Sequence, residues 1–114
     1  MSSTSVGNKA ELAVAAKLAG LGYNVLELNW KTPIAEIDIV ATKNKTAYFI
    51  EVKYRATDSA GDGFDYITDK KLHHMTRAAE AWVAGHDWPH AYELLGASVR
   101  NTDGIFDIDI RDII

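Results

Sequence analysis

Two stretches near the middle of the chain alternate hydrophobic and polar residues with the period of a β-strand. Residues 35–41 read AEIDIVA, and residues 47–55 read AYFIEVKYR. A short polar segment, Thr42 to Thr46, joins the two stretches, which is typical of a β-hairpin. This hairpin is the clearest structural prediction that the hydrophobic pattern allows.

Two other segments repeat hydrophobic residues at helical spacing. Residues 5–21 form the first, ended by glycines at positions 20 and 22, and its repeating positions are Leu12, Ala15, Ala16 and Ala19. Residues 68–84 form the second, with Thr68 as N-cap, a glycine at position 85 as stop, and an apolar face of Leu72, Met75, Ala79, Trp82 and Val83. We therefore expect one helix on either side of the hairpin in the sequence.

Three further strands complete the pattern. They are expected at residues 23–30, 91–100 and 105–110, the last with strict alternation of hydrophobic and charged residues. A loop that contains Gly61 and Gly63 precedes the second helix. The predicted order is αβββαββ, an α/β fold in a single domain that spans residues 1–114.

Composition narrows the class of protein. No apolar stretch approaches the ~18 residues of a membrane span, and the first eight residues lack the apolar run of a secretory signal. The chain has no cysteine, which excludes disulfides and thiolate metal sites. We therefore expect a cytoplasmic protein without a membrane partner. The net charge of −4 argues mildly against nucleic acid, but it comes entirely from residues 86–114, because residues 1–85 carry ten basic and ten acidic residues.

The hairpin places charged residues together. Side chains alternate between the faces of a strand, so Glu51 and Lys53 share one face. If Thr42 pairs with Ala47 across the turn, Asp38 lies directly opposite Glu51, with Cβ atoms ~4.5–5.5 Å apart. A shift of the register by one residue would separate the two carboxylates.

Two facing carboxylates destabilise a sheet unless a positive charge compensates them. A divalent cation such as Mg²⁺ or Mn²⁺ would do so with oxygen ligands, and it would polarise a phosphoryl oxygen or activate a water. Lys53 is then placed to orient that water or to steady the developing charge. The grouping favours phosphodiester hydrolysis, and ordinary charges on a solvated strand face remain the alternative interpretation.

Glu11 borders the apolar face of the first helix, because it lies at helical spacing from Val14, Ala15 and Leu18. Burial of an unpaired carboxylate is costly. Glu11 is therefore either a third carboxylate that reaches the metal site or a solvated glutamate, and the spacing alone leaves both open. We interpret Glu36 as structural, on the face opposite Asp38.

Several motifs match those of a known protein family: GxxAExxVAAxL at residues 7–18, LGYNVL at 21–26, NW at 29–30, EIDIVA at 36–41 and YFIEVKYR at 48–55. Lys70 or Lys71 stands where that family has a lysine at the start of the second helix. On these residues, which cover 7–84, the chain resembles the YraN-like family of predicted endonucleases. That family is distantly similar to Holliday junction resolvases.

The resemblance implies a restriction-endonuclease-like PD-(D/E)xK fold, a mixed sheet flanked by helices. It implies a Mg²⁺- or Mn²⁺-dependent endonuclease, a hydrolase of DNA phosphodiester bonds. Metal ligation falls to Asp38, Glu51 and the backbone carbonyl of Val52, with water positioning by Lys53 and a supporting carboxylate at Glu11. Resolvase-like action on branched DNA would further imply a symmetric homodimer.

Basic residues near these motifs are candidates for nucleic-acid binding. They are Arg55, on the face of Lys53, and a group on the second helix that comprises Lys70, Lys71, His74 and Arg77. A solvated helix face is the alternative for the second group. For the whole protein, the alternatives to a nuclease are a nuclease-fold nucleic-acid-binding module without turnover and, less favoured, a plain protein-interaction domain.

Overall fold

The computed structural model describes residues 6–33, 35–55 and 64–113. These contain two helices and five strands: α1 (Val6–Gly20), β1 (Asn24–Lys31), β2 (Glu36–Lys43), β3 (Thr46–Arg55), α2 (Asp69–Gly85), β4 (Tyr92–Thr102) and β5 (Ile105–Asp112). The predicted αβββαββ order is confirmed, and each boundary lies within two residues of its expected position. The expected loop around Gly61 and Gly63 lies outside the described residues.

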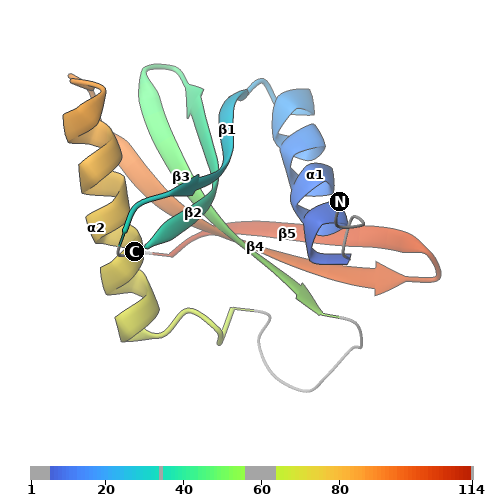
Figure 1. Cartoon of the computed structure of the whole chain (residues 1–114). Helices are drawn as coiled ribbons and strands as arrows, with labels where there is room; N and C mark the ends of the chain where they lie inside the picture. Colours follow the sequence, from blue (N-terminus) through green and yellow to red (C-terminus); the bar gives the residue numbers. More distant parts are fainter. Residues whose placement is uncertain (1–5, 34, 56–63, 114) are drawn as a thin grey trace, which may run out of the picture.

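The strands form one open, mixed sheet in the order β1-β2-β3-β4-β5. Strands β3 and β4 pair in parallel, and the other neighbours pair antiparallel. A parallel pair needs a crossover connection, and α2 supplies it. Figure 1 shows the two helices on opposite sides of the sheet, with the β4–β5 hairpin extending past α1.

The hairpin of β2 and β3 has the predicted register. Thr42 pairs with Ala47, and one more pair, Lys43 with Thr46, forms closer to the turn. The turn is therefore shorter than the expected four residues and consists of Asn44 and Lys45, both with positive φ (51° and 65°). Two central residues in this conformation match the right-handed twist of the flanking strands. The tight turn fixes which residues of β2 and β3 lie opposite each other.

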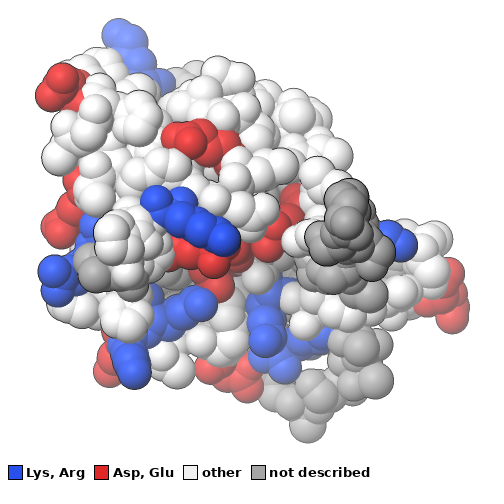
Figure 2. Space-filling model, viewed as in Figure 1, with Lys and Arg blue, Asp and Glu red and all other residues white. Residues whose placement is uncertain are grey.

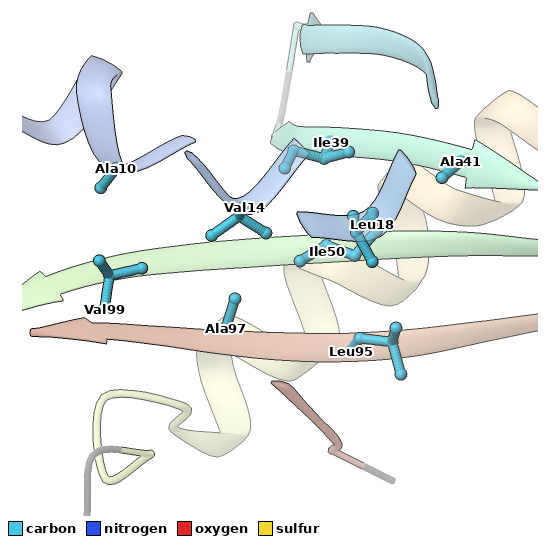
Figure 3. Close-up of a cluster of buried hydrophobic side chains, with 9 residues drawn as sticks. All are labelled: Ala10, Val14, Leu18, Ile39, Ala41, Ile50, Leu95, Ala97 and Val99. Carbon is cyan, nitrogen blue, oxygen red and sulfur yellow. The ribbon is translucent and has the colours of Figure 1, made fainter. Parts of the chain in front are cut away.

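Helix α1 packs on the sheet through the face of Val14 and Leu18, the face that Glu11 was expected to border. Ala10, Val14 and Leu18 point onto the sheet (Figure 3), whereas Leu12 is 54% exposed. Of the predicted positions, Ala15 packs against this cluster, while Ala16 and Ala19 are exposed. The repeat of Leu12, Ala15, Ala16 and Ala19 therefore identifies the helix but not its buried face, because an alanine-rich helix carries little contrast between its faces.

Glycine has a specific role at the end of α1. The amide of Gly22 (φ 95°) donates to Ala19 O at 3.1 Å, and the amide of Tyr23 donates to Leu18 O at 3.0 Å. These two bonds form a Schellman motif, which requires a left-handed residue at this point. The helix therefore ends where the sequence predicts and turns the chain into β1.

Helix α2 packs against the other side of the sheet, as predicted. Its N-cap is Thr68, whose hydroxyl accepts a hydrogen bond from the amide of Lys71 at 3.1 Å. Trp82 is buried against Phe49, with ring centroids 5.5 Å apart, and its indole N–H donates to Glu27 at 2.9 Å. Neither described helix is long and apolar enough to cross a membrane.

Candidate active site

Asp38 and Glu51 lie at the open end of the β2–β3 hairpin. Strand pairing runs from the turn to Ile39 and Ile50, and the two carboxylates occupy the next position on each strand. Beyond this point the Asp38 side chain takes the place of the backbone hydrogen bonds between the strands. Its Oδ2 accepts a hydrogen bond from the amide of Val52 at 2.8 Å. Each carboxylate residue is only 9% exposed. The fold therefore brings together the pair that the sequence predicts.

Both carboxylates open into a pocket beside α2. On β3, Ala47 and Phe49 precede Glu51 on the face that packs against this helix, whereas Ile50 belongs to the cluster beneath α1. The pocket has a volume of about 440 Å³ and is lined by Lys31, Thr32, Ala35, Glu36, Asp38, Glu51, Lys71, His74 and Met75. Figure 2 shows acidic atoms near the centre of the displayed face with a basic side chain across them.

Lys71 contacts the carboxylate pair directly. Its Nζ lies 2.8 Å from Oε2 of Glu51. The ion pair raises the pKa of Lys71 above its ordinary value, which keeps the side chain charged. Sequence reasoning placed Lys71 among the nucleic-acid-binding residues and missed this role, because the contact joins the first turn of α2 to β3.

The negative charges of Asp38 and Glu51 are only partly compensated by their surroundings. Burial, together with the neighbouring charge of Glu51, raises the pKa of Asp38 to about 7, although the Val52 amide opposes this. Burial also raises the pKa of Glu51, and the hydrogen bond from Lys71 only partly offsets it. Such shifts occur when carboxylates lie close together in a poorly solvated site. A further cation near the pair would stabilise the ionised forms of both.

Two more carboxylates act on this centre. Glu11 of α1 has a raised pKa, first from burial and then from the charge of Asp38, and it accepts a hydrogen bond from the Asn29 side chain. Glu36 lines the pocket with Asp38 and raises the pKa values of both Asp38 and Glu51. The interpretation of Glu36 as opposite Asp38 was wrong, because residues two apart on a strand share a face.

Tyr66 supports Glu51 from the segment before α2. Its hydroxyl donates to the backbone oxygen of Glu51 at 3.0 Å and approaches that of Ala97 at 3.4 Å. Burial, followed by the charges of Glu51 and Asp38, raises the pKa of Tyr66, so the hydroxyl stays protonated as a donor. No sequence pattern signals this residue, because it belongs to a connection without periodicity.

Lys53 and Arg55 lie on the face of Glu51 but outside the lining of the pocket. Lys53 is exposed, two residues beyond Glu51 along β3. Arg55 forms an ion pair with Asp65, with an Nη2–Oδ1 distance of 2.5 Å. The structure therefore places the predicted catalytic lysine outside the lining of the pocket and places Lys71 in contact with Glu51.

The predicted basic group on α2 divides in two. Lys71 and His74 line the pocket, whereas Lys70 and Arg77 are exposed outside its lining. Lys31 at the end of β1 also lines the pocket, and sequence reasoning did not single it out. Together these residues place positive charge on two sides of the carboxylates.

The donor set is suited to a hard divalent cation. Among the described residues, no three acidic or histidine side chains converge as a ready-made metal cage. The ligands implied by the sequence resemblance need only the carboxylates of Asp38 and Glu51 and the carbonyl of Val52. A Mg²⁺ site commonly uses one or two carboxylates and keeps several waters. The two buried carboxylates with raised pKa values fit this chemistry.

The fold and site together define a small α/β protein with a buried carboxylate pair in a pocket between a mixed sheet and a helix. The chain belongs to the uncharacterised protein family UPF0102, whose model matches residues 10–110. The matched region contains every candidate residue from Glu11 to Arg77.

Relatives in this family come from diverse bacteria. The UPF0102 protein of Chlorobium chlorochromatii is 32% identical over 101 residues, which cover 87% of this chain and 78% of that protein. The UPF0102 protein of Desulfitobacterium hafniense is 32% identical over 88% of this chain and 86% of its own length. That of Rhodopseudomonas palustris is 40% identical over 77% of this chain and 66% of its own length.

Proposed function

We propose that this protein is a metal-dependent endonuclease of the PD-(D/E)xK type that hydrolyses phosphodiester bonds of DNA, with branched or otherwise structured DNA as its substrate. The observation that supports this most strongly is the pair formed by Asp38 and Glu51. Both carboxylates are buried, adjacent and open to a pocket with basic walls. An electrostatically costly pair of this kind is expected where a cation and an anionic substrate meet.

In this proposal, Asp38, Glu51 and the carbonyl of Val52 hold Mg²⁺ or Mn²⁺. The bound ion would supply Lewis acidity toward a phosphoryl oxygen and lower the pKa of a water. Lys53, which is exposed two residues beyond Glu51, would orient the attacking water and stabilise negative charge on the phosphate. Glu11, which is bonded to Asn29 and lies outside the lining of the pocket, would support the site as a further carboxylate through its charge.

Basic side chains around the pocket would bind the DNA backbone. Lys31 and His74 lie in the pocket wall, and Lys70 and Arg77 continue outward along α2. Arg55 approaches from β3 on the side of Lys53. Contacts of this type position a phosphate chain without reading its sequence. We therefore propose selection by DNA shape, and cleavage of both strands of a junction would require a homodimer.

A second candidate is a nuclease-fold nucleic-acid-binding module without turnover. The ion pair between Lys71 and Glu51 favours it, because an ammonium group already neutralises the carboxylate that would bind the metal. In that case the acidic pocket has no catalytic role, and the basic side chains around it bind nucleic acid.

The decisive experiment incubates purified protein with branched, flapped, duplex and single-stranded DNA in Mg²⁺, Mn²⁺ or EDTA. We expect metal-dependent cleavage that falls at least ~100-fold in Lys53→Ala, the scale of a lost general acid–base or charge-stabilising group. The folded content measured by circular dichroism should not change, because Lys53 is exposed. Lys17→Ala, which removes an exposed lysine from α1, is the matched control and should cleave normally.

The alternatives give different results in the same assay. Binding of branched DNA without cleavage in any metal would favour the binding module. Failure to bind any of these DNAs would contradict both candidates and would favour a protein-interaction domain.

A further inference from the structure

Lys71 lies in the first turn of α2, where a positive charge is unfavourable. Its amide donates to Thr68, the N-cap, which makes Lys71 the third residue of α2. The N-terminus of a helix carries partial positive charge, so a cation in the first turn destabilises the helix. The contact with Glu51 offsets this cost. The charge of Lys71 is therefore explained by the carboxylate pair and not by the helix.

The two members of the ion pair differ in solvent exposure. The side chain of Lys71 is 43% exposed, whereas that of Glu51 is 12% exposed. Glu51 lies within the central sheet, and its backbone oxygen is held by Tyr66. Lys71 reaches it on a flexible four-carbon stem. Lys71 is therefore the partner that can leave.

The ammonium of Lys71 already occupies one oxygen of the carboxylate that would bind the metal. Nζ of Lys71 lies 2.8 Å from Oε2 of Glu51, which is hydrogen-bonding distance. A divalent ion coordinated by that oxygen would stand a few ångströms from the ammonium, and the two positive charges would repel each other in a poorly solvated pocket. Metal and lysine therefore cannot share Oε2 in this arrangement.

We propose that Lys71 is a removable counter-cation that neutralises Glu51 when the site holds no metal and must withdraw when a divalent ion binds. This inference rests on the proposed metal site. Lys71 thereby sets the metal concentration at which the site fills. After withdrawal its ammonium remains at the pocket wall, near His74 and Glu36, where it can meet a phosphate of the substrate.

The test measures Mn²⁺ binding to the full chain by titration calorimetry, in the absence of DNA. Lys71→Met removes the charge and keeps most of the stem, and it should bind Mn²⁺ at least about tenfold more tightly than the unmodified protein. Lys71→Gln repeats the test if the first variant fails to fold. Lys71→Arg keeps the charge and should not gain affinity. Lys17→Met, which removes an exposed lysine of α1 to which no role is assigned, is the control, and its Mn²⁺ affinity should stay within about twofold of the unmodified protein.

Thermal unfolding supplies a second measurement. In EDTA, Lys71→Met should melt at a lower temperature than the unmodified protein at neutral pH, because Glu51 loses its partner. In saturating Mn²⁺ the difference should vanish or reverse. Equal or weaker Mn²⁺ binding by Lys71→Met would overturn the counter-cation role and leave the proposed nuclease intact. Absence of Mn²⁺ binding in the unmodified protein and in every variant would overturn both.

Discussion

The two faces of the sheet use charge in opposite ways. Beneath α1 the buried cluster is entirely hydrophobic, and it comprises Ala10, Val14, Leu18, Ile39, Ala41, Ile50, Leu95, Ala97 and Val99. Beneath α2 the hydrophobic cluster takes Ile37, Val40, Ala47 and Phe49 from the two hairpin strands. The same face also carries Asp38 and Glu51, which are buried but charged.

This contrast shows how one hairpin serves two purposes. Neighbouring residues of β3 point to opposite faces, so Ile50 contributes to a dry core while Glu51 faces the pocket. The α1 face lowers the free energy of the folded state through hydrophobic burial. On the α2 face, two buried carboxylates of like charge raise the free energy of the folded state and so offset part of this stabilisation. The following predictions test this division.

The largest effect should come from the α1 face. Ile50→Ala should lower the free energy of unfolding by about 2–5 kcal/mol, because it removes buried methyl groups and leaves a cavity. Urea unfolding measures the change. Ile105→Ala, at a position 72% exposed, is the control and should change stability by less than about 0.5 kcal/mol. If Ile50→Ala lost as little stability as Ile105→Ala, the α1 face would not be the face that stabilises the fold.

Asp38→Asn should have the opposite effect and raise the free energy of unfolding of the metal-free protein. The pKa of Asp38 in the folded protein is about 7, above the ordinary 3.8, so the native state keeps a proton that the unfolded chain has released. The stability of the metal-free protein should therefore fall as pH rises from about 4 to about 7. An asparagine mimics the protonated form and can still accept from the Val52 amide.

In EDTA, Asp38→Asn should consequently match the unmodified protein near pH 4 and exceed its stability by about 1–3 kcal/mol near pH 7.5. Urea unfolding at both pH values measures this, with Asp107→Asn on the exposed side of β5 as control. Stabilisation by Mn²⁺ should disappear in Asp38→Asn. A large loss of stability at both pH values would instead show that Asp38 is a structural residue.

The smallest effect concerns the start of α2. Thr68→Ala removes the side-chain acceptor for the Lys71 amide and should cost about 1 kcal/mol. Thermal unfolding followed by circular dichroism detects a loss of this size. Thr76→Ala is the matched control, because Thr76 bonds Leu72 O within the same helix and its removal should be nearly neutral. An equal cost in both variants would contradict a specific capping role.

Local interactions explain which parts of this structure can be predicted from the sequence. The hairpin register follows from a short turn and alternating hydrophobic residues, so the meeting of Asp38 and Glu51 was predictable. The contact between Lys71 and Glu51 was not, because it depends on how α2 crosses over the sheet. Tyr66 likewise lies in a connection without a repeating pattern. For α1, the face of Val14, Ala15 and Leu18 was predictable. The repeat that includes Leu12, Ala16 and Ala19 did not mark the buried side, because alanines fit either side.

The two-residue turn of the hairpin restricts how this protein can vary in length. Asp38 lies five residues before Lys43, and Glu51 lies five residues after Thr46, the pair that closes the turn. Insertion of one residue into either strand between the turn and its carboxylate would move that carboxylate to the hydrophobic α1 face, unless a bulge absorbed it. Insertion of two residues into one strand would restore the face but would move the two carboxylates out of their opposite positions. The two strands of this site can therefore lengthen only together and by an even number of residues each, whereas a longer turn leaves the pair in place.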